Sequence, residues 1–447
     1  MKTIHLTAAL AVGITLLNPV SAETIIHNVN LVTMGDDGLV SGKAVVIDEG
    51  RITAIIPESG AASRDAAVII DAGGKYLTPG MVDAHMHHYD AVPYVNYIAN
   101  GVTTVIGLGQ RRSAESFLAL REAIEAGEQI GPQIYTGYMT IASHIDIEDP
   151  DEARDYVRKL KPDGYDLVKV YNNIPQDVFD AVVDEAAKND LSVFGHLPRN
   201  FPVEYSLSHG LDVVAHAEEF YFAYFGGPRD QALPEFDGSD VIDLDRADKV
   251  IDLMVKHDIA LIPNIVFTFV TMRFWDDEEA AMADPEMAYW PEVAHDAWRQ
   301  SNGARRDQID KRMLRDRVKY NVIHDFTRRA QAAGVLIATG TDAPERGVLS
   351  GASVHSEMRE LVKSGLTIEQ ALAAATSNGG KLIEKYIDKD VRLGVIAPGY
   401  EADLVLVSEN PLDNIRNMKM IDGVMVDGVW HDRHALDAMR DALVTAK

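Results

Sequence analysis

The chain has 447 residues, of which 47% are hydrophobic and 25% charged, so it can bury the core of one large domain or two. Its formal charge of −27 argues against binding to nucleic acid or to an anionic lipid surface. It contains no cysteine, which excludes disulfide bonds and a lipid anchor on cysteine.

Residues 1–22 predict a cleavable secretory signal. Lys2 precedes an apolar run over residues 6–17, and Val20-Ser21-Ala22 ends the segment with small residues suited to cleavage. The run is shorter than a membrane-spanning helix, although an uncleaved anchor is the alternative. We therefore expect a periplasmic or secreted protein without a stable membrane anchor, which carries a charge of −28 once residues 1–22 are removed.

Both ends of the mature chain have the composition of β-strands. At the N-terminal end, residues 25–29 and 68–71 read as strands, and residues 44–55 read as a hairpin that turns at Asp48-Glu49-Gly50. At the C-terminal end, residues 402–407 and 423–430 have the same character. These patterns predict one small β-sandwich domain, assembled from residues 23–79 and residues 393–447.

Between these ends, strand-like and helix-like segments alternate, which is typical of an α/β fold with a parallel sheet. The predicted strands are residues 81–87, 102–107, 133–138, 166–171, 191–196, 211–216, 259–263 and 335–342. The clearest helices are residues 115–126, 152–160, 176–190 and 307–333. Eight such units favour a (β/α)8 barrel over residues 80–392, with a doubly wound open sheet as the alternative.

The longest insertion covers residues 267–306, after the seventh predicted strand, and it is rich in aromatic residues. A second aromatic cluster, residues 220–225, follows the sixth strand. Loops at these positions lie over the mouth of a barrel. The insertion is therefore either a lid over the substrate or a peripheral subdomain or dimer contact. We also expect a homo-oligomer, although no sequence motif bears on the oligomeric state.

The first predicted strand of the barrel carries His85 and His87. Side chains alternate along a strand, so these two project from the same face, roughly 6–7 Å apart at Cα, and both can reach one cation. His88 falls on the other face and is the poorer ligand. Two hydrogen-bonded histidines at a strand end would be the plain structural alternative.

Later strands supply similar chemistry. Lys169 lies within the fourth strand, His196 and His216 end the fifth and sixth, and Asp342 ends the eighth. Each has an ordinary explanation when taken alone, such as an ion pair or a helix cap. Because the carboxyl ends of barrel strands converge, six such residues together predict one metal centre.

Lys169 is unusual because an ammonium group would repel cations among histidines. If its amine reacts with CO₂, the resulting carbamate is an anionic oxygen ligand that can bridge two metals. Two divalent ions can hold a bridging hydroxide and polarise a carbonyl group. The ligand types favour Zn²⁺, and Mn²⁺ or Co²⁺ also fit.

The chain resembles the metal-dependent amidohydrolase superfamily over nearly its whole mature length. The matching motifs are LTPGMVDAHMH at the first strand, LVKVY, GHL, AHAEE and ATGTDA at later strands, and LVKSGLTIEQALAAATSN and LGVIAPGYEADLVLV near the end. The likeness is greatest to the branch that contains prolidases and imidazolonepropionases.

The resemblance implies a role for each residue of the site. His85, His87 and Asp342 would bind one metal, His196 and His216 would bind the other, and carbamylated Lys169 would bridge them. Asp342 would also take a proton from the bridging hydroxide and deliver it to the leaving amine.

Two departures from the family pattern limit the activity. Imidazolonepropionases are cytosolic and use one metal without the lysine, so Lys169 and the signal disfavour that reaction. Related deaminases place a glutamate three residues after the fifth-strand histidine, where this chain has Arg199. Glu219 has that spacing after His216, one strand late, which we interpret as chance.

Four residues are weaker candidates for substrate contacts: Tyr171, His144, Arg346 and His355. The leading hypothesis is a secreted binuclear hydrolase that cleaves the amide bond of a dipeptide, an Xaa-Pro compound or an N-acyl amino acid. One alternative is hydrolysis of lactones or phosphotriesters at the same site. Another is a periplasmic binding protein without catalysis.

Overall fold

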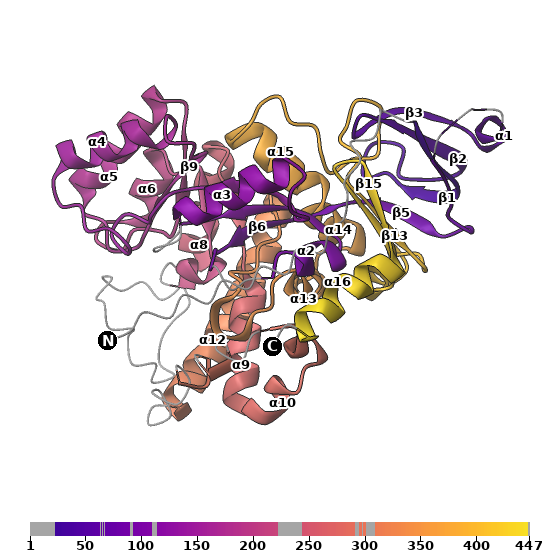
Figure 1. The fold of residues 1–447 in the computed structure, drawn as a ribbon. Coiled ribbons are helices and arrows are strands. Elements are labelled where there is room, and N and C mark those ends of the chain that lie inside the picture. Colours follow the sequence, from indigo (N-terminus) through magenta and orange to yellow (C-terminus); the bar gives the residue numbers. More distant parts are fainter. Residues whose placement is uncertain are drawn as a thin grey trace, which may run out of the picture.

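A computed structural model describes residues 23–445, except 63, 65, 67, 90–92, 110–113, 222–243, 291–294, 297 and 301–308. The expected signal at residues 1–22 lies outside the described residues. Figure 1 shows a β-sheet on the right, where indigo and yellow strands lie side by side, next to a larger body of strands and helices. The first and last parts of the chain thus meet in one sheet.

That sheet has eight strands, in the order β15-β14-β13-β5-β1-β2-β3, with β4 paired to β1. The strands are β1 (Thr24–Val32), β2 (Leu39–Asp48), β3 (Arg51–Pro57), β4 (Val68–Asp71), β5 (Tyr76–Pro79), β13 (Leu404–Val407), β14 (Ile421–Val426) and β15 (Val429–Asp432). The predicted hairpin is confirmed, because Asp48 of β2 pairs with Arg51 of β3. The two ends of the chain join where β13 pairs antiparallel with β5, Leu404 opposite Pro79.

The sheet coheres because apolar side chains from both ends of the chain pack on each other. Ile26 and Leu31 of β1 share one buried cluster with Leu404 and Leu406 of β13 and Met425 of β14. These strands are rich in branched residues that suit a pleated, half-buried surface. Whether this part of the chain is a separate β-sandwich domain remains a prediction.

The larger body contains two parallel sheets that match seven of the eight strands predicted there. One sheet holds β6 (Met81–Met86), β7 (Val102–Gly107) and β8 (Gln133–Thr136); the other holds β9 (Leu167–Val170), β10 (Ser192–Gly195), β11 (Val213–Ala215) and β12 (Ala260–Ile262). Each observed strand lies within the predicted segment and ends at or before its last residue. The prediction of an α/β fold with parallel strands is confirmed.

The eighth predicted strand, residues 335–342, is not a continuous strand. It forms isolated parallel bridges, Ile337 to Leu261 of β12 and Ala343 to Met86 of β6. Asp342 has a φ of 66°, a left-handed conformation that interrupts a regular ladder. A further bridge joins Gly137, just after β8, to Leu167 of β9. The segment therefore lies between β12 and β6 without the regularity that its apolar sequence predicted.

Helices surround these strands. The four clearest predicted helices are confirmed, and each observed end lies within two residues of the predicted one. The helices of the first half are α1 (Glu58–Ala61), α2 (Val95–Ala99), α3 (Ala114–Glu125), α4 (Pro150–Leu160), α5 (Gln176–Lys188), α6 (Val203–Ser208), η1 (Ala217–Phe220) and α8 (Leu244–Lys256). Those of the second half are α9 (Ile265–Asp276), α10 (Glu278–Met282), η2 (Pro285–Tyr289), α12 (Ile309–Ala333), η4 (Glu345–Gly347), α13 (Ala352–Ser364), α14 (Ile368–Ala375), α15 (Ser377–Tyr386), η5 (Ile415–Lys419) and α16 (Arg433–Thr445).

The insertion over residues 267–306 contains most of α9 together with α10 and η2. Trp298 is buried, and its indole N–H donates to the carbonyl oxygen of Pro344 at 3.1 Å. The insertion therefore packs against the chain that follows Asp342. Of the cluster at residues 220–225, only Phe220 and Tyr221 are described, and both are buried.

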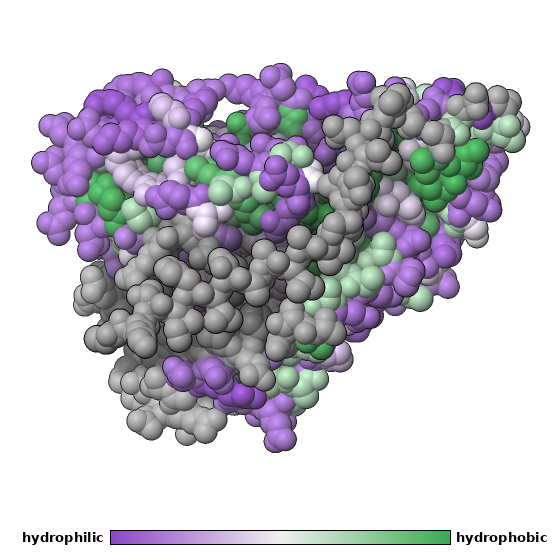
Figure 2. All heavy atoms as spheres, in the orientation of Figure 1, coloured by the Kyte–Doolittle hydropathy of each residue, from purple (hydrophilic) through white to green (hydrophobic). Residues whose placement is uncertain are grey.

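Within the described part of the chain, no helix is both long enough and apolar enough to cross a membrane. The coloured surface in Figure 2 is mostly hydrophilic over the α/β body, and a hydrophobic patch lies at the right, over the strands of the sheet.

We predict that the two ends of the chain stabilise each other through the sheet. Leu404→Ala removes a fully buried side chain, so the free energy of unfolding should fall by about 2–5 kcal/mol. The matched control is Leu39→Ala in β2, where the side chain is 46% exposed. Urea unfolding followed by circular dichroism measures both, and equal effects would contradict the prediction.

Candidate metal centre

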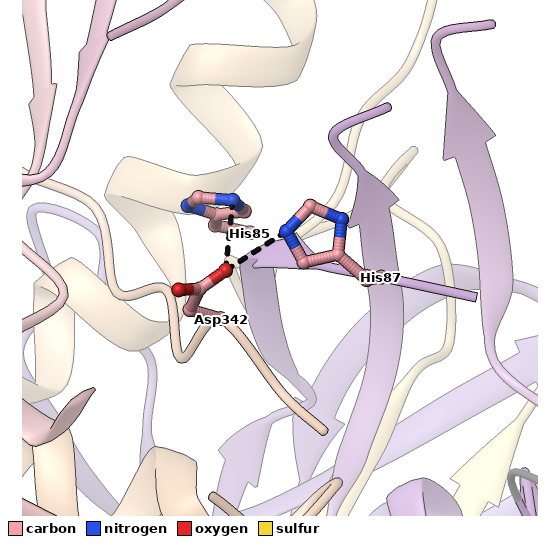
Figure 3. Close-up of side chains that lie close together, drawn as sticks. All are labelled: His85, His87 and Asp342. Atoms are coloured by element: carbon pink, nitrogen blue, oxygen red, sulfur yellow. Dashed lines mark ion pairs between the residues drawn. The ribbon is translucent and has the colours of Figure 1, made fainter. Parts of the chain in front are cut away.

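The ends of β6 and of the eighth segment bring three predicted ligands together. Asp342 Oδ1 lies 2.9 Å from Nε2 of His87 and 3.4 Å from Nε2 of His85. Figure 3 shows both imidazole rings turned toward this carboxylate. Ligand atoms of all three residues lie within 4.8 Å of one another, so the group could hold a metal ion.

Hydrogen bonds on the far side of each ring set which nitrogen faces the carboxylate. Nδ1 of His87 lies 3.0 Å from the carbonyl oxygen of Gly109, and Nδ1 of His85 lies 3.0 Å from Oδ1 of Asn264. A carbonyl oxygen only accepts, so each Nδ1 donates its proton. In the neutral ring, Nε2 of each histidine then carries the lone pair that a metal requires.

The other three predicted ligands lie beside this group. The His216 ring centre is 4.8 Å from that of His85 and 4.5 Å from that of His196. Nε2 of His216 lies 4.0 Å from Oδ2 of Asp342. Lys169 is 3% exposed and lines the same cavity as the other five, except the fully buried His85. The structure thus places together the six residues that the sequence singled out.

Burial and neighbouring charges control the protonation of the site. Burial lowers the pKa of His216 to about 3 and that of Lys169 to about 7, although the carboxylates of Asp342 and Glu219 oppose the shift at Lys169. Burial also lowers the pKa of His85. For His87, burial is outweighed by the carboxylate of Asp342, which raises the pKa. Burial therefore favours the uncharged forms of His85, His216 and Lys169, whose lone pairs can then bind a cation.

A divalent cation fits this donor set. Among the described residues, His85 Nε2, His216 Nδ1 and Lys169 Nζ are buried without a hydrogen-bond partner. Buried polar atoms are nearly always satisfied, so three unsatisfied atoms within one group of candidate ligands indicate a missing partner. Imidazole nitrogens and carboxylate oxygens are typical ligands of Zn²⁺.

Sequence reasoning missed Glu219. We interpreted its spacing after His216 as chance, but its carboxylate Oε1 accepts a hydrogen bond from Nδ1 of His196 at 2.8 Å. Arg199 donates to both oxygens of Glu219, each at 3.1 Å. Glu219 therefore orients a ligand of the fifth strand rather than the histidine that precedes it. In the sequence, the signal for Glu219 was its place in the motif AHAEE, three residues after His216.

Asp83 was also missed, although it lies inside the opening motif. Its Oδ1 accepts from the backbone N–H of Thr341 at 2.9 Å and of His85 at 3.3 Å, and its Oδ2 accepts from the Thr341 hydroxyl at 2.6 Å. Burial raises the pKa of Asp83 to about 7. The residue ties the strand that carries His85 to the segment that carries Asp342.

A cavity of about 400 Å³ opens beside the candidate ligands, and most of the residues that line it are polar or charged. Charged groups of both signs also line it, among them Glu218, Arg315, Lys319 and Glu345. Glu218 pairs with Lys319 at 2.6 Å. Phe267, from the insertion, also lines the cavity.

Two of the four predicted substrate contacts, Tyr171 and His144, line this cavity. The prediction for His355 is wrong, because the ring is buried in α13 and its Nε2 lies 2.9 Å from the carbonyl oxygen of Asn100. His355 therefore joins α13 to the end of α2. The side chain of Arg346 lies outside the described residues. His88, which we excluded as a ligand, bonds through Nδ1 to the Tyr94 hydroxyl at 2.7 Å and stacks on Phe117.

Comparison with known proteins supports the family resemblance. The profile described as the Amidohydrolase family matches residues 318–431. Imidazolonepropionase from Idiomarina loihiensis is 28% identical over 154 residues, or 30% of this chain and 37% of that protein. Enamidase from Eubacterium barkeri is 23% identical over 460 residues, which cover 95% of this chain and all of the enamidase.

Among solved structures, the chain is similar to a Xaa-Pro dipeptidase with methionine bound in its active site. The TM-score is 0.67 at 24% identity, with 92% of this chain and 100% of the dipeptidase covered. At that identity the likeness concerns the fold. The match to the imidazolonepropionase spans little more than a third of that protein.

We predict that Gly340→Ala disrupts the centre. A Cβ atom there would lie 2.3 Å from Ile262 Cγ2 and 2.8 Å from His85 Cβ, so the backbone or the ring must shift. Overpacking of this kind costs about 1–3 kcal/mol of stability, and bound metal should fall with it. The matched control is Gly60→Ala, where the nearest atom would be 3.6 Å away. Thermal unfolding and metal analysis compare the two, and wild-type metal content in Gly340→Ala would refute the prediction.

Proposed function

We propose that the chain, which matches the Amidohydrolase family over residues 318–431, is a metal-dependent hydrolase with two metal ions that cleaves the amide bond of a small charged substrate. One observation carries the proposal: six residues with ligand chemistry, from five strand ends, meet beneath a polar cavity. A cavity above convergent, unsatisfied ligand atoms is the usual form of a catalytic site.

His85, His87 and Asp342 would hold one metal, and His196 and His216 the other. Lys169 would bridge them as a carbamate, formed when the neutral amine adds to the carbon of CO₂ and releases one proton. A pKa of about 7 keeps much of Lys169 neutral, which that addition requires. When bound, two divalent ions supply a water of lowered pKa and polarise a carbonyl oxygen.

The chain itself would move the proton. A carboxylate oxygen of Asp342 would accept it from the attacking water and return it to the nitrogen of the leaving amine. Asp342 is 6% exposed, so little bulk water competes for that proton. The ring of Tyr171 packs edge-on against that of His196, with 4.3 Å between the ring centres. Burial raises the pKa of Tyr171, so the Tyr171 hydroxyl stays protonated and can donate to substrate.

The charges of the cavity favour a zwitterionic or anionic amide over an apolar ester. Arg315 and Lys319 can bind a carboxylate, and Glu218 can bind an ammonium group. Dipeptides, Xaa-Pro compounds and N-acyl amino acids carry such groups, whereas most phosphotriesters and lactones do not. Hydrolysis of lactones or phosphotriesters remains the second candidate, because the same metal site could attack those bonds.

We also propose the finer fold and location. The parallel bridges from β8 to β9, from β12 to residue 337 and from residue 343 to β6 support a closed (β/α)8 barrel over residues 80–392, beside a β-sandwich from residues 23–79 and 393–447. The pattern of residues 1–22 supports export to the periplasm or medium. The expected homo-oligomer stays a prediction, which the mass in solution would test.

A substrate panel tests the proposal. The zinc-loaded protein should hydrolyse at least one dipeptide, Xaa-Pro compound or N-acyl amino acid faster than any lactone or phosphotriester. If phosphotriesters turned over fastest and every amide were inert, the amidase proposal would be wrong. A protein that held well under one equivalent of metal after reconstitution would instead be a binding protein without catalysis.

We predict that Lys169→Ala binds less than two equivalents of metal and loses most activity, because the bridge is gone. Added acetate or propionate should restore part of the rate by taking the place of the carbamate. Metal analysis and initial rates measure both effects. Lys389→Ala, which changes a lysine side chain that is 74% exposed, is the matched control. Wild-type rates in Lys169→Ala would contradict the mechanism.

We predict that Asp342→Asn folds normally but turns over substrate several orders of magnitude more slowly, since an amide oxygen is a far weaker proton acceptor. Circular dichroism checks the fold, and steady-state kinetics checks the rate. Asp437→Asn, at a side chain that is 57% exposed, serves as the control. A loss of less than tenfold in Asp342→Asn would exclude Asp342 as the proton shuttle.

A further inference from the structure

Asn264 touches both halves of the metal centre although no sequence motif marks it. It lies two residues after the end of β12 and is the residue before the first turn of α9, with a left-handed φ of 52°. The side chain is buried, and its Oδ1 receives two hydrogen bonds. One comes from Nδ1 of His85 at 3.0 Å and the other from the backbone N–H of His216 at 3.2 Å.

These two bonds together decide the protonation of His85. The backbone N–H of His216 donates to the Ile262 carbonyl oxygen at 2.9 Å and also lies 3.2 Å from Oδ1 of Asn264. Because an N–H can only donate, this second contact favours the amide oxygen over the amide nitrogen on the side of His216. The same oxygen faces His85, so Nδ1 of His85 must carry the proton there. Nε2 of His85 is then the atom with the lone pair, and it is the atom 3.4 Å from Asp342.

The surroundings hold Asn264 in this position. Glu357 of α13 is fully buried, and its carboxylate accepts the backbone N–H groups of Ile265 at 3.1 Å and Val266 at 2.7 Å. This anchors the first turn of α9 beside Asn264. On the opposite side Gly340 has no Cβ, which would lie 3.1 Å from the Asn264 amide nitrogen. The backbone that carries Asn264 is therefore held in place by α13.

We propose that Asn264 is a positioning residue that fixes the His85 tautomer and couples it to the His216 strand end, so that metal binding at both halves depends on one amide oxygen. The inference rests on the proposed metal centre. Groups that orient a metal-bound histidine typically change metal affinity by about 10–100-fold.

The test uses the full chain with Zn²⁺ and three variants. Asn264→Gly removes the oxygen while allowing the left-handed backbone, and Asn264→Asp keeps an acceptor at the same place. Asn28→Gly is the matched control, since Asn28 in β1 also has a φ of 52° and lies in the terminal sheet. Zinc affinity is measured by competition with a chelator, and the stability of the zinc-free proteins by thermal unfolding.

Asn264→Gly should bind zinc about 10–100-fold more weakly at both sites, with Asn264→Asp within a few-fold of wild type and Asn28→Gly unchanged. Wild-type affinity in Asn264→Gly would overturn the inference and leave the proposed function intact. A wild-type protein that binds no zinc would overturn both. A weakening that Asn28→Gly shares would also overturn the inference, because the effect would then be structural.

A second measurement reads the tautomer directly in the wild-type protein. In wild-type protein with ¹⁵N-labelled histidine, the nitrogen shifts distinguish a proton on Nδ1 from one on Nε2. The inference expects His85 to carry its proton on Nδ1 in the zinc-free and zinc-loaded protein, with its signal identified by the change in Asn264→Asp. A proton on Nε2 of His85 in the zinc-free protein would overturn it.

Discussion

The pairing of β6 with the eighth segment is the constraint on which the site depends. Backbone bonds run from Thr341 N–H to the His85 carbonyl oxygen at 3.1 Å and from His87 N–H to the Ala343 carbonyl oxygen at 2.7 Å. They join residues more than 250 positions apart in the chain and set the carboxylate of Asp342 between two imidazoles. Asp83 strengthens the same junction through three hydrogen bonds in a region that water does not reach.

Around that junction, each histidine of the site except His216 bonds through Nδ1 to an oxygen outside the centre. The oxygens belong to the amide of Asn264, the backbone of Gly109 and the carboxylate of Glu219. The three partners differ in charge, so they should tune the basicity of their rings differently. Only the partner of His196 is a carboxylate, and Arg199 shares its charge by donating to both oxygens of Glu219.

The site combines buried ligands with a charged cavity, and the two parts have different physical tasks. Burial lowers the pKa of His216 and that of Lys169, which favours the uncharged forms that can bind a cation. The cavity wall contains ion pairs such as that between Glu218 and Lys319, in which the two charges stabilise each other. A polar substrate can exchange with those pairs at a small desolvation cost, whereas an apolar substrate gains little from such a wall.

The sequence by itself determined the parallel α/β arrangement, the joining of both ends in one sheet and all six candidate ligands. Those features follow from local apolar patterns and from the convergence of strand ends, which any chain with this pattern must obey. Only the tertiary structure decided that residues 335–342 form isolated bridges and no regular strand, and that the His355 ring is buried. It also decided that Glu219 bonds to His196 and that Asn264 bonds to His85. These outcomes depend on contacts between residues far apart in sequence, and a hydrogen-bond partner of that kind leaves no periodic or spacing signal in the chain.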